Sequence, residues 1–220
     1  DRESRMKSRE TDSLIESLTA ELKPVRALRF REGMALVLVS VVLTVMLVAR
    51  FLGLRDDVMA GEPAPLFLIS NGLFLMLGLA AATGVLMMGN PQVGNRYDGW
   101  KWALATAGLL PLAAGVSALA SWSGHPEVVY PEHDPLCISA GVMFGGLTAL
   151  ALVFWLRRGA PASPARAGLL TGIATGAIGT FADGLYCPLD SIYHLGFAHS
   201  MPILICALLG RLFLPHFIRW

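Results

Sequence analysis

The segment GLYCPLDSIYH, from Gly184 to His194, brings together side chains that can bind a metal ion or undergo redox chemistry. It holds Cys187 and, seven residues later, His194. A second cysteine, Cys137, follows His133 by four residues in the sequence HDPLC. Thiolate and imidazole groups are ligands of copper and zinc, and two thiols that approach closely enough can also form a disulfide.

The residues alone leave three interpretations of Cys137 and Cys187 open: small buried apolar side chains, a permanent disulfide, or a responsive pair that is oxidised or binds a metal on demand. The responsive pair is favoured because possible ligands lie near both thiols in the sequence, namely His133, His194, Glu132, Asp134 and Asp190. Cys206 lies among Ile, Leu and Ala and is interpreted as a buried apolar residue. The remaining histidines are interpreted as surface residues: His125, His199 and His216.

The composition indicates which elements must position these side chains. Of the 220 residues, 55% are hydrophobic and 15% are charged, against about 25% charged in soluble domains. Residues 33–49 and 65–92 carry no charge, and about 20 apolar residues span a membrane as a helix. We therefore expect an all-α, six-helix transmembrane bundle with spans at residues 33–53, 65–88, 101–122, 136–156, 167–186 and 195–214.

The distribution of basic residues predicts how the chain is oriented in a bacterial inner membrane. All but Arg50 and Arg55 of the 17 Lys and Arg fall in the N-terminal tail, two alternate loops and the C-terminal end. Short cytoplasmic segments carry the excess of Lys and Arg. We expect a multi-pass protein with both termini in the cytoplasm, divided into a tail at residues 1–32 and a membrane domain at 33–220.

This orientation places both cysteines on the outer face. Ala162, midway between Cys137 and Cys187, lies in the centre of a tight cytoplasmic turn. Helices joined by a short connection are usually antiparallel neighbours. Because Cys137 and Cys187 are equally far from Ala162 along the chain, their thiols are expected at nearly the same depth in the membrane. Disulfides persist in the periplasm and are reduced in the cytosol, so the outer location allows redox chemistry as well as metal binding.

The N-terminal tail contains a predicted amphipathic helix of about eleven residues. Ser13 and Glu16 fit a capping box at its start, and Pro24 is expected to end it. Its apolar residues form one stripe: Leu14, Ile15, Leu18 and Leu22. The helix carries more acid than base, which favours a hydrophobic groove of a cytoplasmic partner over anionic lipid.

Glycines recur at every fourth residue in the fifth span, at Gly168, Gly172 and Gly176. Small residues at this spacing let membrane helices approach closely. We favour packing inside one bundle; a homodimer through this face is the alternative.

Over nearly its whole length from Met6 the chain resembles the NrsF-type anti-sigma factors. The resemblance rests on the tail TDSLIESLTAELKPVRALR, the six spans, FWLRRGAPASPARAGLLTG, and one cysteine at each of two outer loops, the second in YCPLDS. It implies an inhibitor that sequesters an extracytoplasmic-function (ECF) sigma factor. The binding segment would run from Leu14 to Arg26, including Pro24 and Val25. Cys137 and Cys187 would sense a heavy metal, such as copper or zinc, or an oxidant. No obligatory cofactor is implied.

Two other functions are weighed against this one. A quinone-linked thiol oxidoreductase usually needs vicinal or repeated cysteine pairs for exchange, whereas each outer loop here has one cysteine. A small transporter tends to carry ionisable groups near the membrane midplane, and only His199 is a candidate for that role. The basic tail is interleaved with acids and adjoins a span, so no direct nucleic-acid binding is expected.

Overall fold

A computed structural model describes residues 2–20, 28–89, 98–122 and 132–218 of the chain. Within these residues all regular structure is helical, which confirms the all-α prediction. The helices are α1 (Arg2–Ala20), α2 (Phe30–Phe51), α3 (Asp56–Met59), α4 (Pro65–Met88), α5 (Gly99–Ala107), α6 (Leu109–Trp122), α7 (Asp134–Phe144), α8 (Gly146–Arg158), α9 (Pro164–Gly184), α10 (Ile192–Phe197) and α11 (Met201–Ile218).

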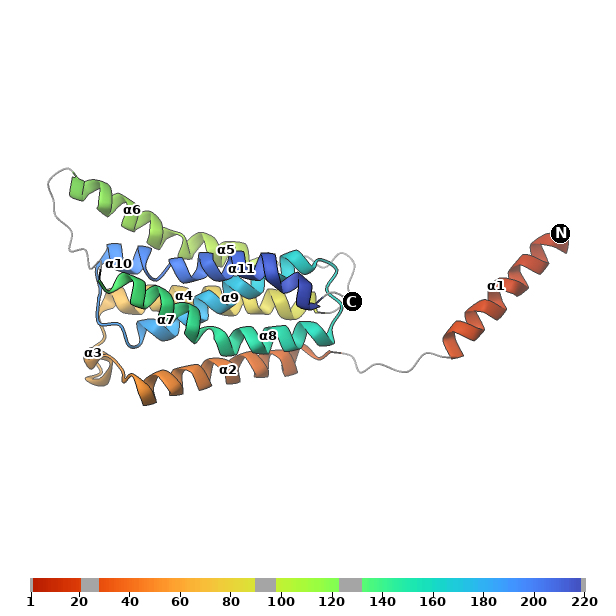
Figure 1. The fold of residues 1–220 in the computed structure, drawn as a ribbon, viewed down its shortest axis with the longest axis horizontal. Helices are drawn as coiled ribbons and strands as arrows, with labels where there is room; N and C mark the ends of the chain where they lie inside the picture. Colours follow the sequence, from red (N-terminus) through yellow and green to blue (C-terminus); the bar gives the residue numbers. More distant parts are fainter. Residues whose placement is uncertain (1, 21–27, 90–97, 123–131, 219–220) are drawn as a thin grey trace.

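Four helical segments of the described chain are long and apolar enough to cross a membrane, which indicates a multi-pass membrane protein. They are α2, α4, the α7–α8 pair (Asp134–Arg158) and the α10–α11 pair (Ile192–Ile218). The α5–α6 pair and α9 also run along the long axis of the bundle (Figure 1). These helices are not among the four segments because glycine lowers the mean hydropathy of α9, and because α5 and α6 are each shorter than 18 residues.

Helix α9 lies at the centre of the bundle and packs against α4, α7 and α11. A Cβ atom at Gly168 would overlap the carbonyl of Gly210, and one at Gly172 would overlap the carbonyl of Cys206. At Gly176 a Cβ would meet the backbone of Ile203. The glycine face of α9 is therefore covered by α11 of the same chain, which leaves it unavailable as a dimer surface.

Three of the expected spans are broken helices, and proline or close packing explains each break. A proline lacks an N–H, and its ring clashes with the carbonyl four residues earlier in a helix. For Pro111 this carbonyl belongs to Ala107, where α5 ends. For Pro202 it belongs to Ala198, which begins the turn after α10. Between α7 and α8, a Cβ at Gly145 would overlap the carbonyl of Thr175 on α9. The Pro111 interruption was expected; the other two breaks were not.

Helix α1 corrects the predicted start of the tail helix. It begins at Arg2, so Ser13 lies in the interior of the helix and not at its N-cap. Leu14, Ile15 and Leu18 are 58%, 53% and 60% exposed, and α1 lies apart from the bundle (Figure 1). The other predicted binding residues, Leu22, Pro24, Val25 and Arg26, lie outside the described residues.

The connections gather at opposite ends of the bundle. At one end the Arg55 N–H donates to the Leu185 carbonyl (3.0 Å), and Cys137 contacts Cys187. At the other end the Ala160 N–H donates to the Gly89 carbonyl (3.1 Å). The prediction that the two cysteines share one depth is therefore confirmed.

Candidate metal and redox centre

Cys137 and Cys187 meet because two helix ends converge. Cys137 lies in the first turn of α7, and the Cys187 N–H donates to the carbonyl of Asp183 (2.9 Å) at the end of α9. Their sulfur atoms lie 3.6 Å apart, and both residues are free, buried thiols. Ala198, Ile138 and Leu189 pack around the pair. The structure thus brings together the two residues that the sequence singled out.

His194 joins this pair, as the sequence suggested. Ser191 caps α10 and its hydroxyl accepts a hydrogen bond from the His194 N–H (3.1 Å). The ring Nδ1 lies 2.6 Å from Asp134 Oδ1, and Nε2 lies 3.4 Å from Cys187 Sγ. The Asp134 carboxylate at Nδ1 fixes the orientation of the ring, which directs Nε2 at the sulfur. This is how carboxylates orient metal-binding histidines.

His199 completes the group, and its assignment to the surface was wrong. It is 1% exposed and lies in the turn between α10 and α11 that Pro202 imposes. Its carbonyl, released by that turn, accepts a hydrogen bond from the Thr180 hydroxyl (3.0 Å), and its ring contacts that of His194 edge-on with centroids 5.1 Å apart. In the sequence, only Pro202, eight residues after the end of the GLYCPLDSIYH segment, hints at this break.

Polar atoms beside His199 lack hydrogen bonds within the described structure. Both ring nitrogens of His199 and both carboxylate oxygens of Asp183 are buried without such a partner. The closest approach, 3.5 Å between His199 Nε2 and Asp183 Oδ2, meets an ion-pair distance but not hydrogen-bond geometry. Burying unpaired polar groups is costly. A bound cation would stabilise these groups.

The four donor atoms fit a tetrahedral metal better than they fit a disulfide. The donors of Cys137, Cys187, His194 and His199 all lie within 4.8 Å of one another. Zinc–sulfur bonds of about 2.3 Å place two tetrahedral thiolates ~3.8 Å apart, close to the observed 3.6 Å. A disulfide requires about 2.0 Å, so bond formation would need the sulfurs to move together. Two thiolates with two imidazoles is a common zinc ligand set.

Cys187 has the properties of a ligand or a reactive thiol. The Cys137 thiol donates a hydrogen bond to Cys187 Sγ, and this bond, ahead of the contact with His194, lowers the pKa of Cys187 below its ordinary value. The thiolate is the form that binds metals and attacks oxidants.

His133 lies next to the cluster in the chain but not within it. Its carbonyl accepts the Cys137 N–H (3.1 Å) at the start of α7, and its side chain is exposed. Glu132 is exposed as well. Cys206 is buried in the middle of α11, as expected, and is not among the four clustered donors.

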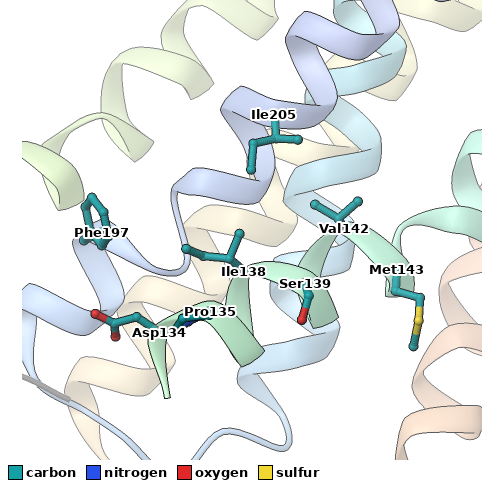
Figure 2. Close-up of a pocket in the computed structure, with 8 residues that line it drawn as sticks. All are labelled: Asp134, Pro135, Ile138, Ser139, Val142, Met143, Phe197 and Ile205. Carbon is teal, nitrogen blue, oxygen red and sulfur yellow. The ribbon is translucent and has the colours of Figure 1, made fainter. Parts of the chain in front are cut away.

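An apolar groove of about 730 Å³ lies between α7 and the α10–α11 segment. Figure 2 shows its lining residues, which are Asp134, Pro135, Ile138, Ser139, Val142, Met143, Phe197 and Ile205. Asp134 is the charged member of this lining, and its carboxylate also holds His194. The other lining residues carry no charge, so the candidate metal ligands are those of the cysteine–histidine cluster, which Asp134 contacts through His194.

Comparisons with known proteins identify the family. A family model described as "NrsF: Negative regulator of sigma F" matches residues 18–220. The anti-sigma-F factor NrsF of Caulobacter vibrioides (strain NA1000 / CB15N) is 28% identical over 222 residues, covering 96% of this chain and 99% of the relative. No solved structure matches. The chain belongs to the NrsF family of negative regulators of sigma F, and it is a regulatory protein rather than an enzyme.

Proposed function

We propose that this chain is a membrane-bound anti-sigma factor that holds an ECF sigma factor in the cytoplasm and releases it when the outer cysteine–histidine cluster binds a metal or is oxidised. The observation that carries the proposal is the buried group of four donors at one end of the bundle. Family membership, and a relative named as an anti-sigma-F factor, support the regulatory role.

The proposed topology has six spans, with both termini in the cytoplasm of a bacterial inner membrane. The α5–α6 pair and α9 supply the two crossings beyond the four that satisfy length and hydropathy. The Lys and Arg residues concentrate at the end of the bundle away from the cluster, as expected for the cytoplasmic side. The cluster then faces the periplasm, where metals and oxidants arrive first.

The proposed sigma-binding segment is the tail, with α1 presenting its apolar stripe. Leu14, Ile15 and Leu18 are more than half exposed, at 58%, 53% and 60%. An amphipathic helix of this kind fits a hydrophobic groove. We extend the segment to Leu22, Pro24, Val25 and Arg26 on the basis of the sequence.

The proposed sensing residues are Cys137, Cys187, His194 and His199. We assign the fourth position to His199 rather than to His133, because His199 is buried within the group and His133 is exposed. A bound copper or zinc ion would supply a positive charge that pulls the four donors together. Asp134 would orient His194, as its 2.6 Å contact with Nδ1 indicates.

Oxidation is the second route, because the sulfurs, now 3.6 Å apart, need only a short movement to form an S–S bond of about 2.0 Å. Cys137 and Cys187 would lose two protons and two electrons to a two-electron oxidant such as hydrogen peroxide, forming one S–S bond and two water molecules. This route draws the end of α7 towards the segment after α9.

Co-purification tests the proposed function. The tagged full-length protein is isolated from its host with and without exposure of the cells to zinc, copper or peroxide, and its partners are identified by mass spectrometry. We expect a sigma factor to be captured at rest and lost on exposure. The Cys137→Ser and Cys187→Ser variants should capture it under both conditions. Absence of any sigma factor, or normal release from both variants, would contradict the proposal.

A further inference from the structure

The guanidinium of Arg55 is the most heavily bonded side chain near the cluster. All five of its N–H donors have acceptors, and its side chain is only 6% exposed. Nη1 donates to the Cys187 carbonyl (3.1 Å) and to Asp190 Oδ1 (2.9 Å), and Nη2 donates to Asp190 Oδ2 (2.6 Å). The paired bonds to Asp190 are the strong bidentate kind. Arg55 thus forms hydrogen bonds with both ends of the Cys187–Asp190 segment.

Further contacts fix Arg55 itself. Nε and Nη2 donate to the two oxygens of Asp57 (2.5 and 2.9 Å), and the guanidinium lies 4.5 Å from the ring centroid of Phe67 on α4. Its backbone N–H donates to the Leu185 carbonyl. The hydrogen bonds that Arg55 donates to Asp190 raise the pKa of Arg55 despite its burial. The residue therefore stays charged and has little freedom to change partners.

Only a short, constrained turn separates Arg55 from α2. Gly53 ends the helix in the left-handed conformation (φ 87°), and its N–H donates to the Val48 carbonyl (3.2 Å). A non-glycine residue would be strained at this φ. A displacement of the Cys187 segment therefore reaches the outer end of α2 through three residues of tight turn rather than through a flexible loop.

Helix α2 is the element that follows the N-terminal tail in the chain. Two of its polar contacts lie deeper in the bundle, where Ser40 Oγ approaches Thr148 Oγ1 on α8 (3.2 Å) and the Thr44 hydroxyl donates to the Phe144 carbonyl (3.5 Å). These contacts join α2 to the α7–α8 pair and not to the segment that carries Cys187. Arg55 is the polar link between α2 and Cys187 in the described structure.

We propose that Arg55 is a positioning residue of the cluster, which ties the Cys187 segment to the end of α2 and passes a change in cysteine ligation to the helix that follows the tail. The inference rests on the proposed function. It adds the residue through which the outer cluster acts on sigma binding. Metal binding itself does not require Arg55, because its side chain contributes none of the four donors.

The test measures the coupling between the two sites in purified full-length protein in lipid nanodiscs. The dissociation constant of the co-purified sigma factor is measured with Zn²⁺ and without it, and the ratio of the two constants is the coupling. Zn²⁺ affinity is measured separately by competition with a chelator. Allosteric couplings are typically 5–150-fold, and we expect the wild-type ratio to fall in this range.

Arg55→Gln should lower this ratio to within twofold of one while Zn²⁺ still binds. Arg50→Gln is the matched control: it removes a basic charge at the same end of α2, but Arg50 is exposed and its guanidinium lies over the ring of Phe51. Its ratio should equal that of the wild type. Asp190→Asn breaks the bidentate pair more gently, and it should lower the ratio several-fold even if Arg55→Gln folds poorly.

The outcomes separate the two proposals. A wild-type ratio of one contradicts the proposed function and with it the role of Arg55. A wild-type ratio that persists in Arg55→Gln, or in Asp190→Asn where the first variant does not fold, overturns the inference alone. Loss of coupling in Thr148→Val but not in Arg55→Gln would also overturn it, because the signal would then travel through α8.

Discussion

Replacing Asp134 by asparagine tests whether the cluster is built to bind metal. Asp134 holds His194 Nδ1 at 2.6 Å, so that Nε2 is directed at Cys187 Sγ. Asparagine keeps the shape of the side chain but removes its charge, so His194 loses a charge-assisted hydrogen bond and the preference for one tautomer. The four candidate ligands remain in place.

The structure sets the size of the expected effect. Loss of a carboxylate that orients a metal-binding histidine typically costs 10–100-fold in metal affinity, or about 1.4–2.8 kcal/mol. His194 is 0% exposed, so water cannot compensate for the lost negative charge, and we expect an effect near the upper end of this range.

The assay is competition between the reduced, metal-free protein in detergent and a chromophoric chelator of Zn²⁺. Glu132→Gln is the matched control, because it removes an exposed acid two residues away that lies outside the cluster. A loss of less than twofold in Asp134→Asn would refute the reasoning. So would an equal loss in Glu132→Gln, because the effect would then come from general charge rather than from the orientation of His194.

Three further predictions address the tail, the cluster and the bundle. Leu18→Asp should reduce sigma capture at least tenfold without changing membrane insertion, measured by co-purification and membrane fractionation; unchanged capture would remove α1 from the mechanism. Cys187→Ser should abolish tight Zn²⁺ binding, whereas Cys206→Ser should bind normally in the same titration, and equal behaviour would count against the four-donor site. Gly172→Ala should destabilise the protein by roughly 1–3 kcal/mol, because its methyl group would overlap the α11 backbone. Gly72→Ala, which has open space around it, should be neutral or slightly stabilising in thermal unfolding.

Apolar run lengths predicted the helical class and the order of the long segments, because hydrocarbon thickness constrains them directly. Midpoint symmetry around Ala162 likewise predicted that Cys137 and Cys187 share one depth. The breaks between α7 and α8 and between α10 and α11 were missed. They depend on tertiary contacts, such as Gly145 against Thr175, and on a proline that a membrane helix can often accommodate.

His199 was missed for the same reason. In an unbroken sixth span it would be an isolated histidine, and only the turn before Pro202 brings it towards Cys187. Arg55 was counted only as a basic residue on the outer side. Its partners lie two and 135 positions away, and no local pattern in the sequence links Arg55 to Asp190.

The most direct test of the account is a sidedness experiment in sealed vesicles with the tail facing outward and the sigma factor bound to it. Zn²⁺ is supplied either to the lumen alone or to the outside alone, and release of the sigma factor is measured by sedimentation. We expect release when the metal reaches the lumen, where the cluster lies, and no release from the Cys137→Ser variant. Release by external metal only, or equal release from the variant, would contradict the claim that the outer cysteine–histidine cluster controls sigma binding.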